Sequence, residues 1–403
     1  MTNHASPSGP TASTLRGTIL LLGGIAALGS LATQLLIPAL PSIASELNVG
    51  VASAQLVVGV FLIGLGGGQL MLGPISDRMD RRLLLVLGLL LYSLGSLAAG
   101  FAASLGLLLT ARLVQALGSS AGLVTTRVLL NAMVPPEKSV SAQASLMMIV
   151  LISPALAPVL GGLMTEWMGW RTIMFVLSGA GLVGALVVLR KIPATQRSEA
   201  RPARPPLRVS YARVLHNGRF RAAATAMGFS SASLYLFLGA APFLLQRDYQ
   251  LSPREIGLFM LAIAGMSIVG TRFVGRMQKW VNPLRLGTLL ALVAALLLAA
   301  LSSQGPPHIL LMLAPLALTG LTAGMIGPTA ITHILGSEPG LEGTATSLAG
   351  ALQMGASALL AWLLGPFAAQ APLNLALALL PLTCVAALGA VAVDRAGRRR
   401  EAV

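Results

Sequence analysis

Apolar residues follow one another along most of this chain in long runs, and short polar segments separate the runs. A helix rises about 1.5 Å per residue, so roughly 20 apolar residues in a row can cross the hydrocarbon core of a membrane. We therefore predict an all-α membrane protein with twelve transmembrane helices. These are expected near residues 17–40, 51–73, 83–103, 106–134, 140–164, 169–190, 221–245, 255–275, 284–302, 309–335, 343–367 and 372–393.

One polar segment, residues 191–220, is much longer than the others and is rich in proline and arginine. It divides the chain into two six-helix halves, residues 17–190 and 221–394, with short tails at 1–16 and 395–403. We interpret residues 191–220 as a basic linker between the halves. Its composition is that of a tether with room for a short helix at the membrane surface.

The two halves resemble each other. The segment "SAQASLMMIVL" (141–151) aligns with "GTATSLAGALQ" (343–353), and "SSAG" (119–122) aligns with "LTAG" (321–324) at the same offset. Repeats of this kind form pseudo-symmetric halves that rock around a site near the membrane midplane. We expect the short interfacial helix of the linker around Tyr211–Leu215.

Charge is distributed unevenly between the two sides of the predicted membrane. Lys and Arg number 27 against 12 Asp and Glu, and most of the basic residues fall on the side of the tails and the linker. By the positive-inside rule, both termini are then cytoplasmic. The basic residues form no single face, and aromatic residues make up only 4% of the chain, which argues against binding of nucleic acid.

The sequence carries little of the chemistry that enzymes use. The four histidines are scattered, and neither an HExxH motif nor a phosphate-binding GK[ST] loop occurs. The single cysteine, Cys384, lies in an apolar run, so no disulfide framework and no CxxC metal site are expected. We therefore predict no enzyme activity, no metal and no cofactor.

Three motifs resemble signatures of the major facilitator superfamily. "GPISDRMDRRLLL" (73–85) resembles its cytoplasmic signature between helices 2 and 3, and "LLLTARLVQALGSSAG" (107–122) resembles its helix 4 signature. "ISPALAPVLGG" (152–162) resembles the helix 5 signature of drug:proton antiporters. The stretches "IPALPSI", "APFLLQRDYQLSPREIGLF" and "GTATSLAGALQMGASAL" resemble the Bcr/CflA-type drug-resistance branch.

This resemblance implies a secondary active efflux transporter of the cell inner membrane. It would export drug-like or small metabolite solutes by alternating access, in exchange for protons, with the proton gradient as its energy source. Its partners would be the small-molecule solute, protons and the lipid bilayer, and we expect a monomer. The alternatives are a major facilitator importer or uncoupled facilitator, and a non-transporting membrane receptor or scaffold.

A conformational latch is implied for four charged residues of the first motif: Asp77, Arg78, Arg81 and Arg82. Arginines alone would anchor a cytoplasmic loop, but they do not explain an acid at the end of a helix, where the dipole disfavours it. The resemblance implies that the cluster holds the cytoplasmic ends of the two halves together, with Asp77 near residues 343–345. Asp80 stands where the family usually has a small residue.

Two arginines lie inside predicted spans, where charge is costly and usually functional. Arg112 could be a cation on the cavity side of its helix, where it would contact solute or relay protons. It could instead extend to the outer membrane surface. Arg127 lies near the inner end of the same helix and is expected to be structural.

The helix 5 motif contributes four residues that bend a helix or allow close approach: Pro154, Pro158, Gly161 and Gly162. The resemblance implies that this helix packs on the eighth helix and seals the path against leakage. Gly265 and Gly270 of the eighth helix would suit that contact.

The proton-binding group is harder to assign. All twelve acidic residues fall in loops or at the ends of spans, and Gln34 stands where the branch commonly has an aspartate in the first helix. The remaining candidates are Glu166, His333 and, as a third possibility, the region of Asp77 and Arg127. Coupling could also be unusual, could be carried by a charged solute, or could be absent.

By analogy with the family, the solute cavity is lined by helices of both halves. Few aromatic residues and no deep acid argue against a strongly cationic solute and favour a neutral or weakly anionic amphiphile, with Arg112 as its partner. The candidate cavity residues are Gln34, Gln115, Met147, Ser231, Tyr235, Phe237 and Gln353.

Overall fold

The computed structural model describes residues 12–76, 79–134, 136–193 and 207–401, and this part of the chain is helical with no β-strand. Within these described residues, twelve helices are long and apolar enough to cross a membrane. The elements are α1 (Ala12–Gln34), η1 (Ile37–Ala39), α2 (Leu40–Glu46), α3 (Val51–Ser76), α4 (Arg81–Gly100), α5 (Leu105–Met133), α6 (Pro136–Met168), α7 (Trp170–Lys191), α8 (Leu207–His216), α9 (Gly218–Tyr249), α10 (Pro253–Met277), α11 (Pro283–Leu301), α12 (Ile309–Leu335), α13 (Glu342–Ala368) and α14 (Pro372–Glu401).

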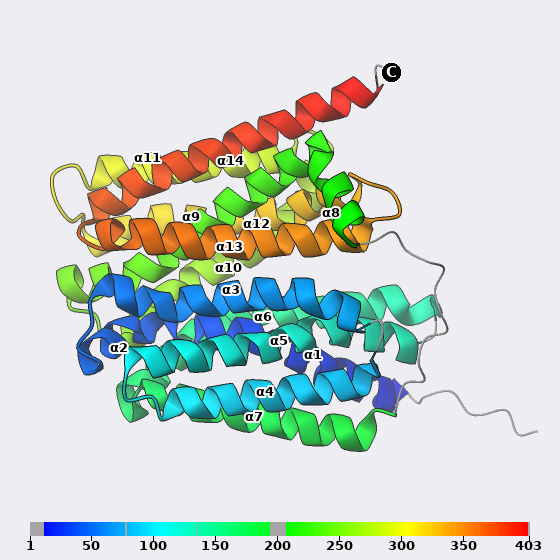
Figure 1. Cartoon of the computed structure of the whole chain (residues 1–403). Coiled ribbons are helices and arrows are strands. Elements are labelled where there is room, and N and C mark those ends of the chain that lie inside the picture. The colour runs from blue at the N-terminus through cyan, green and yellow to red at the C-terminus, as the bar shows by residue number, and fades with distance from the viewer. Residues whose placement is uncertain (1–11, 77–78, 135, 194–206, 402–403) are drawn as a thin grey trace, which may run out of the picture.

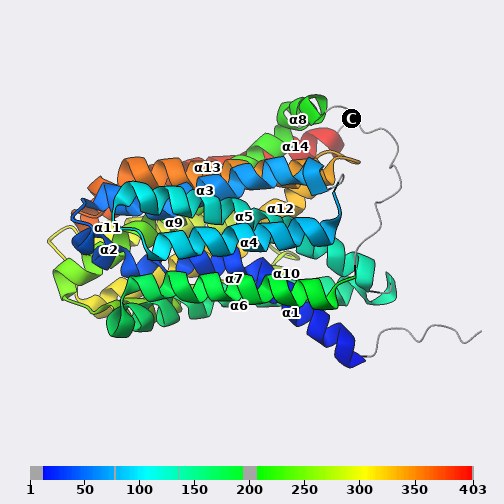
Figure 2. The same ribbon diagram turned by 60° about the horizontal axis from the view of Figure 1, so that its bottom comes forward.

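The helices form two groups that lie side by side (Figure 1). We call α1–α7 the first half and α9–α14 the second half. The most extensive contacts between the halves join α3 to α13 and α6 to α10. One end of the bundle carries α8 and the C-terminus, and we call it the linker end; α2 lies at the opposite end, which we call the α2 end (Figures 1 and 2).

The first predicted span differs from the structure in its second part. A continuous helix was expected over residues 17–40, but α1 ends at Gln34 and two short helices, η1 and α2, follow. Pro38 and Pro41 stand at the starts of these short helices. Pro38 has no N–H to donate to the backbone oxygen of Gln34, four residues earlier, so α1 ends there and the chain turns across the α2 end. The helix expected around Tyr211–Leu215 is present as α8, and its place at the membrane surface stays a prediction.

Polar side chains begin several helices at the ends of the bundle. Asp80 precedes α4 and accepts a hydrogen bond from the backbone N–H of Leu83, with an N···O distance of 3.1 Å. Ser252 and Glu255 form a capping box at the start of α10. Such caps satisfy backbone N–H groups that have no partner within the helix. At the α2 end, the single residue Gly169 joins α6 to α7 with a φ of +82°, which glycine adopts without strain.

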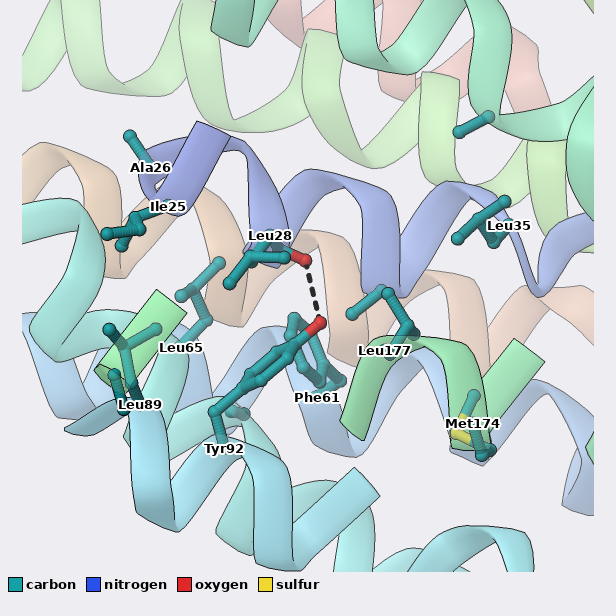
Figure 3. Packing of buried hydrophobic residues seen from close by; sticks show 14 of the residues in the cluster. Ile25, Ala26, Leu28, Leu35, Phe61, Leu65, Leu89, Tyr92, Met174 and Leu177 are labelled. Carbon is teal, nitrogen blue, oxygen red and sulfur yellow. Dashed lines mark hydrogen bonds between the residues drawn. The ribbon is translucent and has the colours of Figure 1, made fainter. Parts of the chain in front are cut away.

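Each half has its own apolar core. In the first half, Tyr92, Phe61 and Trp170 are fully buried among leucine and isoleucine side chains. Figure 3 shows Tyr92 pointing to the backbone carbonyl of Leu28, to which its hydroxyl donates a hydrogen bond of 3.2 Å. Many large apolar side chains instead point outward, as expected of a surface that faces lipid.

Candidate functional site

The two halves share apolar contacts at the α2 end. Ile37 of η1 packs in the core of the second half, among residues of α9, α10 and α12. Leu40, Val58 and Leu62 of the first half form a further buried cluster with Ala358 of α13. The bundle is therefore closed at the α2 end by side chains from both halves.

Small residues allow α3 and α13 to lie close together along the membrane. A Cβ atom added at Gly59 would lie 3.8 Å from the backbone oxygen of Ala358. A Cβ atom added at Gly66 would lie 3.1 Å from the Cβ atom of Met354. These glycines bring the helix axes together from the α2 end to the middle of the bundle.

A closer seam joins α6 to α10. A Cβ atom added at Gly162 would overlap the backbone oxygen of Pro253, and one added at Gly257 would overlap the backbone oxygen of Pro158. Gly161 lies in the same way against the backbone oxygen of Leu35. The expected packing of this helix pair is thus present, and Pro158 and Gly162 take part in it, whereas Gly161 packs within the first half. The side chain of Pro154 lies outside the described residues.

The glycines expected on the α10 side of this seam are not the ones that form it. A Cβ atom added at Gly265 would meet nothing within 4 Å, and Gly270 lies against Leu321 of α12, within the second half. The prediction was wrong because the helices touch most closely at the α2 end, where Gly257 lies one turn into α10.

Glu166 extends the α6–α10 contact at its outer edge. Its Oε2 atom accepts a hydrogen bond of 3.2 Å from the backbone N–H of Arg254, in the first turn of α10. A carboxylate is favourable at this position because the N-terminus of a helix carries partial positive charge. Glu166 is exposed to solvent, so it joins the two halves at the surface of the α2 end.

A cavity of about 70 Å³ lies between the halves near the seam. Gln34 and Pro158 line it from the first half, and the second half contributes mostly apolar residues. These are Leu234, Leu238, Met260, Ile263, Ala264, Ser267 and Ala323. Gln34 thus faces a space between the halves.

Some of the other candidate cavity residues lie away from the apolar cores, and others are buried in them. Ser231 and Gln353 join α9 to α13 through a hydrogen bond of 2.5 Å from Nε2 to Oγ, and Tyr235 lines a second cavity between the halves. Phe237 is only 1% exposed and belongs to the core of the second half, so its assignment to the cavity was wrong. The side chain of Met147 lies outside the described residues.

Arg112 is buried inside the first half and reaches neither the membrane surface nor the two cavities between the halves. Its Nε donates to the backbone oxygen of Val57 at 3.2 Å, its Nη1 donates to Oε1 of Gln115, and its Cζ lies 4.2 Å from the ring centre of Phe61. Gln115 donates in turn to Oγ of Ser96 at 2.7 Å. This network joins α3, α4 and α5, and the cavity-side interpretation of Arg112 and Gln115 was wrong because the arginine turns into its own half.

The predicted latch lies only partly within the described residues. Asp77 and Arg78 fall outside them, and Arg81 begins α4. Arg82 donates through Nη2 to the backbone oxygen of Leu189 at the end of α7, so its contact stays within the first half. The latch between the halves therefore stays a prediction. The side chain of Arg127 also lies outside the described residues.

His333 lies at the linker end of α12, far along the bundle from Glu166. Its Nδ1 atom lies 3.2 Å from Nη2 of Arg219, within the second half. In the part of the chain that the structure describes, no group of three or more His, Cys, Asp or Glu residues could hold a metal ion.

Gln55 is a residue that the sequence reasoning missed. It begins the second turn of α3, is only 5% exposed and lies against α13 at the α2 end. Neither its Nε2 nor its Oε1 has a hydrogen-bond partner among the described residues. Its one signal in the sequence is that it interrupts the apolar run "VASAQLVVGVFLIGL".

Comparisons with known proteins agree with this arrangement. The model of the family described as the Major Facilitator Superfamily matches residues 22–361. The chain is 30% identical over 372 residues to "Multidrug resistance protein D" of Escherichia coli (strain K12), covering 91% of this chain and 93% of that protein. It is 29% identical to the "Chloramphenicol resistance protein" of Pseudomonas aeruginosa, covering 83% of this chain and 80% of that protein.

A solved structure has the same fold. It is that of a bacterial homologue of the human lysosomal transporter Spinster, in an inward-facing and occupied conformation. The two structures align with a TM-score of 0.77 at 16% sequence identity, covering 96% of this chain and 98% of that one.

Proposed function

The chain belongs to the Major Facilitator Superfamily, and on that premise we propose that it exports drug-like or small metabolite solutes across the cell inner membrane. It is a transporter and not an enzyme, and it acts on a small-molecule substrate from within the lipid bilayer. The observation that carries the proposal is the cavity between the halves. It is lined by Gln34 and apolar side chains and is closed by the α6–α10 seam at one end.

The lining of this cavity supports neutral amphiphilic solutes as the cargo. Its polar groups are an amide and a hydroxyl, from Gln34 and Ser267, and the other lining side chains are apolar. Among the described residues, acidic side chains lie at or near helix ends, so no carboxylate inside the membrane would attract a cation. The relatives named for resistance to several drugs and to chloramphenicol support the same class of solute.

We propose that the linker end faces the cytoplasm, together with both termini, and that the α2 end faces outward. The basic residues of the linker and the C-terminal tail support this orientation. Solute would enter from the linker end and leave when the contacts at the α2 end separate. The two arrangements need differ by only a few kcal/mol for solute and protons to shift their populations.

We further propose that export is exchanged for protons and that Glu166 is the group that responds to them. Gln34 cannot bind a proton at neutral pH, whereas Glu166 is exposed at the α2 end and holds the first turn of α10. Protonation would remove the negative charge that favours this contact, which is worth about 0.3–1 kcal/mol at an exposed helix N-terminus. His333 is the weaker candidate because its neighbour Arg219 is itself a cation.

Accumulation of radiolabelled chloramphenicol in intact cells tests this function. Cells that express the chain should accumulate less than cells with an empty vector, and a protonophore should remove the difference. Glu166→Gln should reduce export and its dependence on external pH, while Glu255→Gln, which changes a carboxylate of the α10 capping box, serves as the matched control. Export would be overturned if expressing cells and empty-vector cells accumulated equal amounts of chloramphenicol and of each drug in a panel of other neutral drugs. Net uptake by the expressing cells would overturn it as well. Export that ignores the protonophore would overturn the proton exchange alone.

A further inference from the structure

The amide of Gln55 is buried at the junction of three helices. A Cβ atom added at Gly365 of α13 would overlap its Oε1 atom, and one added at Gly239 of α9 would lie 3.6 Å from its Nε2 atom. Both glycines therefore leave room for the amide, in helices of the opposite half. The side chain extends from α3 across the boundary between the halves.

A small cavity of about 20 Å³ lies beside this amide. Tyr235 and Gly239 line it from α9, and the remaining walls are apolar or glycine. They are Leu40, Val58, Gly59, Leu62, Ala358 and Ala361. A space of this size holds about one water molecule, so the cavity accepts a single polar group and not a whole drug-sized solute.

An amide is an unfavourable choice for a residue that only seals an interface. Burying its donor and acceptor without protein partners costs free energy, whereas a methionine of similar length would bury only apolar atoms. A buried amide is favourable where a polar group of a bound molecule forms hydrogen bonds with it. No charged side chain lines the cavity, so that group is neutral.

We infer that Gln55 recognises the transported solute at the α2 end of the path, by hydrogen bonds to a neutral amide or hydroxyl group. This inference rests on the proposed function and names the group that selects its substrate there. The contact is made as α3 and α13 separate at this end, because the closed cavity admits only a small group. Tyr235 places a second polar side chain on the opposite wall.

Ligand-dependent stability of the purified full-length protein separates recognition from a structural role. The probe is chloramphenicol, a neutral compound with an amide and two hydroxyl groups, and the variant is Gln55→Met. The matched control is Gln246→Met, which changes an exposed glutamine near the end of α9. Melting temperature is measured in lipid nanodiscs with and without chloramphenicol, and export is measured in cells.

We expect Gln55→Met to melt at the same temperature as the wild type or higher, because it buries no unpartnered amide. Its melting-temperature shift with chloramphenicol should shrink, and its KM for export should rise by about 3- to 10-fold, the loss of one to two hydrogen bonds. Gln246→Met should match the wild type in all three measurements. Gln55→Asn, which keeps the amide, should recover part of the shift.

Three outcomes would overturn the inference in different ways. An unchanged chloramphenicol shift and an unchanged KM in Gln55→Met, beside a wild type that exports the drug, would overturn the role of Gln55 and leave the proposed function intact. A lower melting temperature with an unchanged shift would assign Gln55 to packing and overturn recognition. A wild type that neither binds nor exports chloramphenicol or other neutral drugs would overturn both.

Discussion

The seam between α6 and α10 allows a direct test of how the α2 end is kept closed. In Gly162→Ala, the new methyl group would overlap the backbone oxygen of Pro253, and neither backbone can yield without moving a helix. Forcing an extra methyl group into a packed contact costs about 1–3 kcal/mol. If the halves separate to relieve the overlap, the population of the open arrangement relative to the closed one rises by about 5- to 150-fold.

Alkylation of a buried cysteine measures this shift. The native Cys384 is exposed and is replaced by serine, and Ala358, which is buried and lines the small cavity at the α2 end, is replaced by cysteine. In intact cells, Gly162→Ala should raise the rate of labelling by a membrane-impermeant maleimide within that range, because the reagent reaches Cys only in the open arrangement. Gly265→Ala is the matched control, since a methyl group there meets nothing within 4 Å.

An unchanged labelling rate in a Gly162→Ala protein that still reaches the membrane would refute the reasoning. It would mean that the helices absorb the methyl group by a small local shift and that other contacts hold the end closed. Equal acceleration by Gly162→Ala and Gly265→Ala would also refute it, because the effect would then come from helix propensity and not from the overlap.

Three further substitutions test the interpretation of individual residues. Gln34→Asp places an acid in the cavity between the halves, and export in cells should then depend more steeply on pH than in the wild type. Arg112→Ala removes two charge-assisted hydrogen bonds, worth about 1.5–3 kcal/mol each, and leaves Oε1 of Gln115 without its donor, while the backbone oxygen of Val57 keeps its bond within α3. The melting temperature in detergent should therefore fall, and Arg112→Lys should not restore it, because lysine lacks the planar fork. Asp80→Ala removes the cap of α4 and should cost about 1 kcal/mol in the same melting assay, whereas Asp80→Asn should retain most of the stability.

Much of the architecture could be predicted because the membrane imposes it. Helices must satisfy their own backbone in lipid, so runs of apolar residues give the number and the approximate limits of the spans. The break after Gln34 was missed although Pro38 and Pro41 are plain in the sequence, because the apolar run continues through both. Hydropathy reports the presence of a span but not the point at which its axis turns.

The site was harder to predict because the direction of each side chain is set by packing between helices. Arg112 and Gln115 lie three residues apart on α5, and from the sequence we considered only the cavity for both and, for Arg112, the outer membrane surface. Close contacts with α3 and α4 turn both side chains into the first half. Among several glycines of α10, Gly257 forms the seam only because the helices cross near the α2 end. A crossing point depends on both helices and cannot be read from one of them.

The two glutamines at the boundary between the halves explain how a path without a deep acid could still select its cargo. Gln34 faces the larger cavity, and Gln55 faces the smaller one nearer the α2 end. An amide offers a donor and an acceptor whatever the pH, so these positions can bind a neutral solute without titrating. On the two proposals above, solute recognition and proton response are assigned to different residues, with the amides inside the boundary and the carboxylate of Glu166 at its outer edge. Protons would then act on the closure of the α2 end and would not compete with solute for one carboxylate, so we expect separate substitutions to change solute and proton affinities.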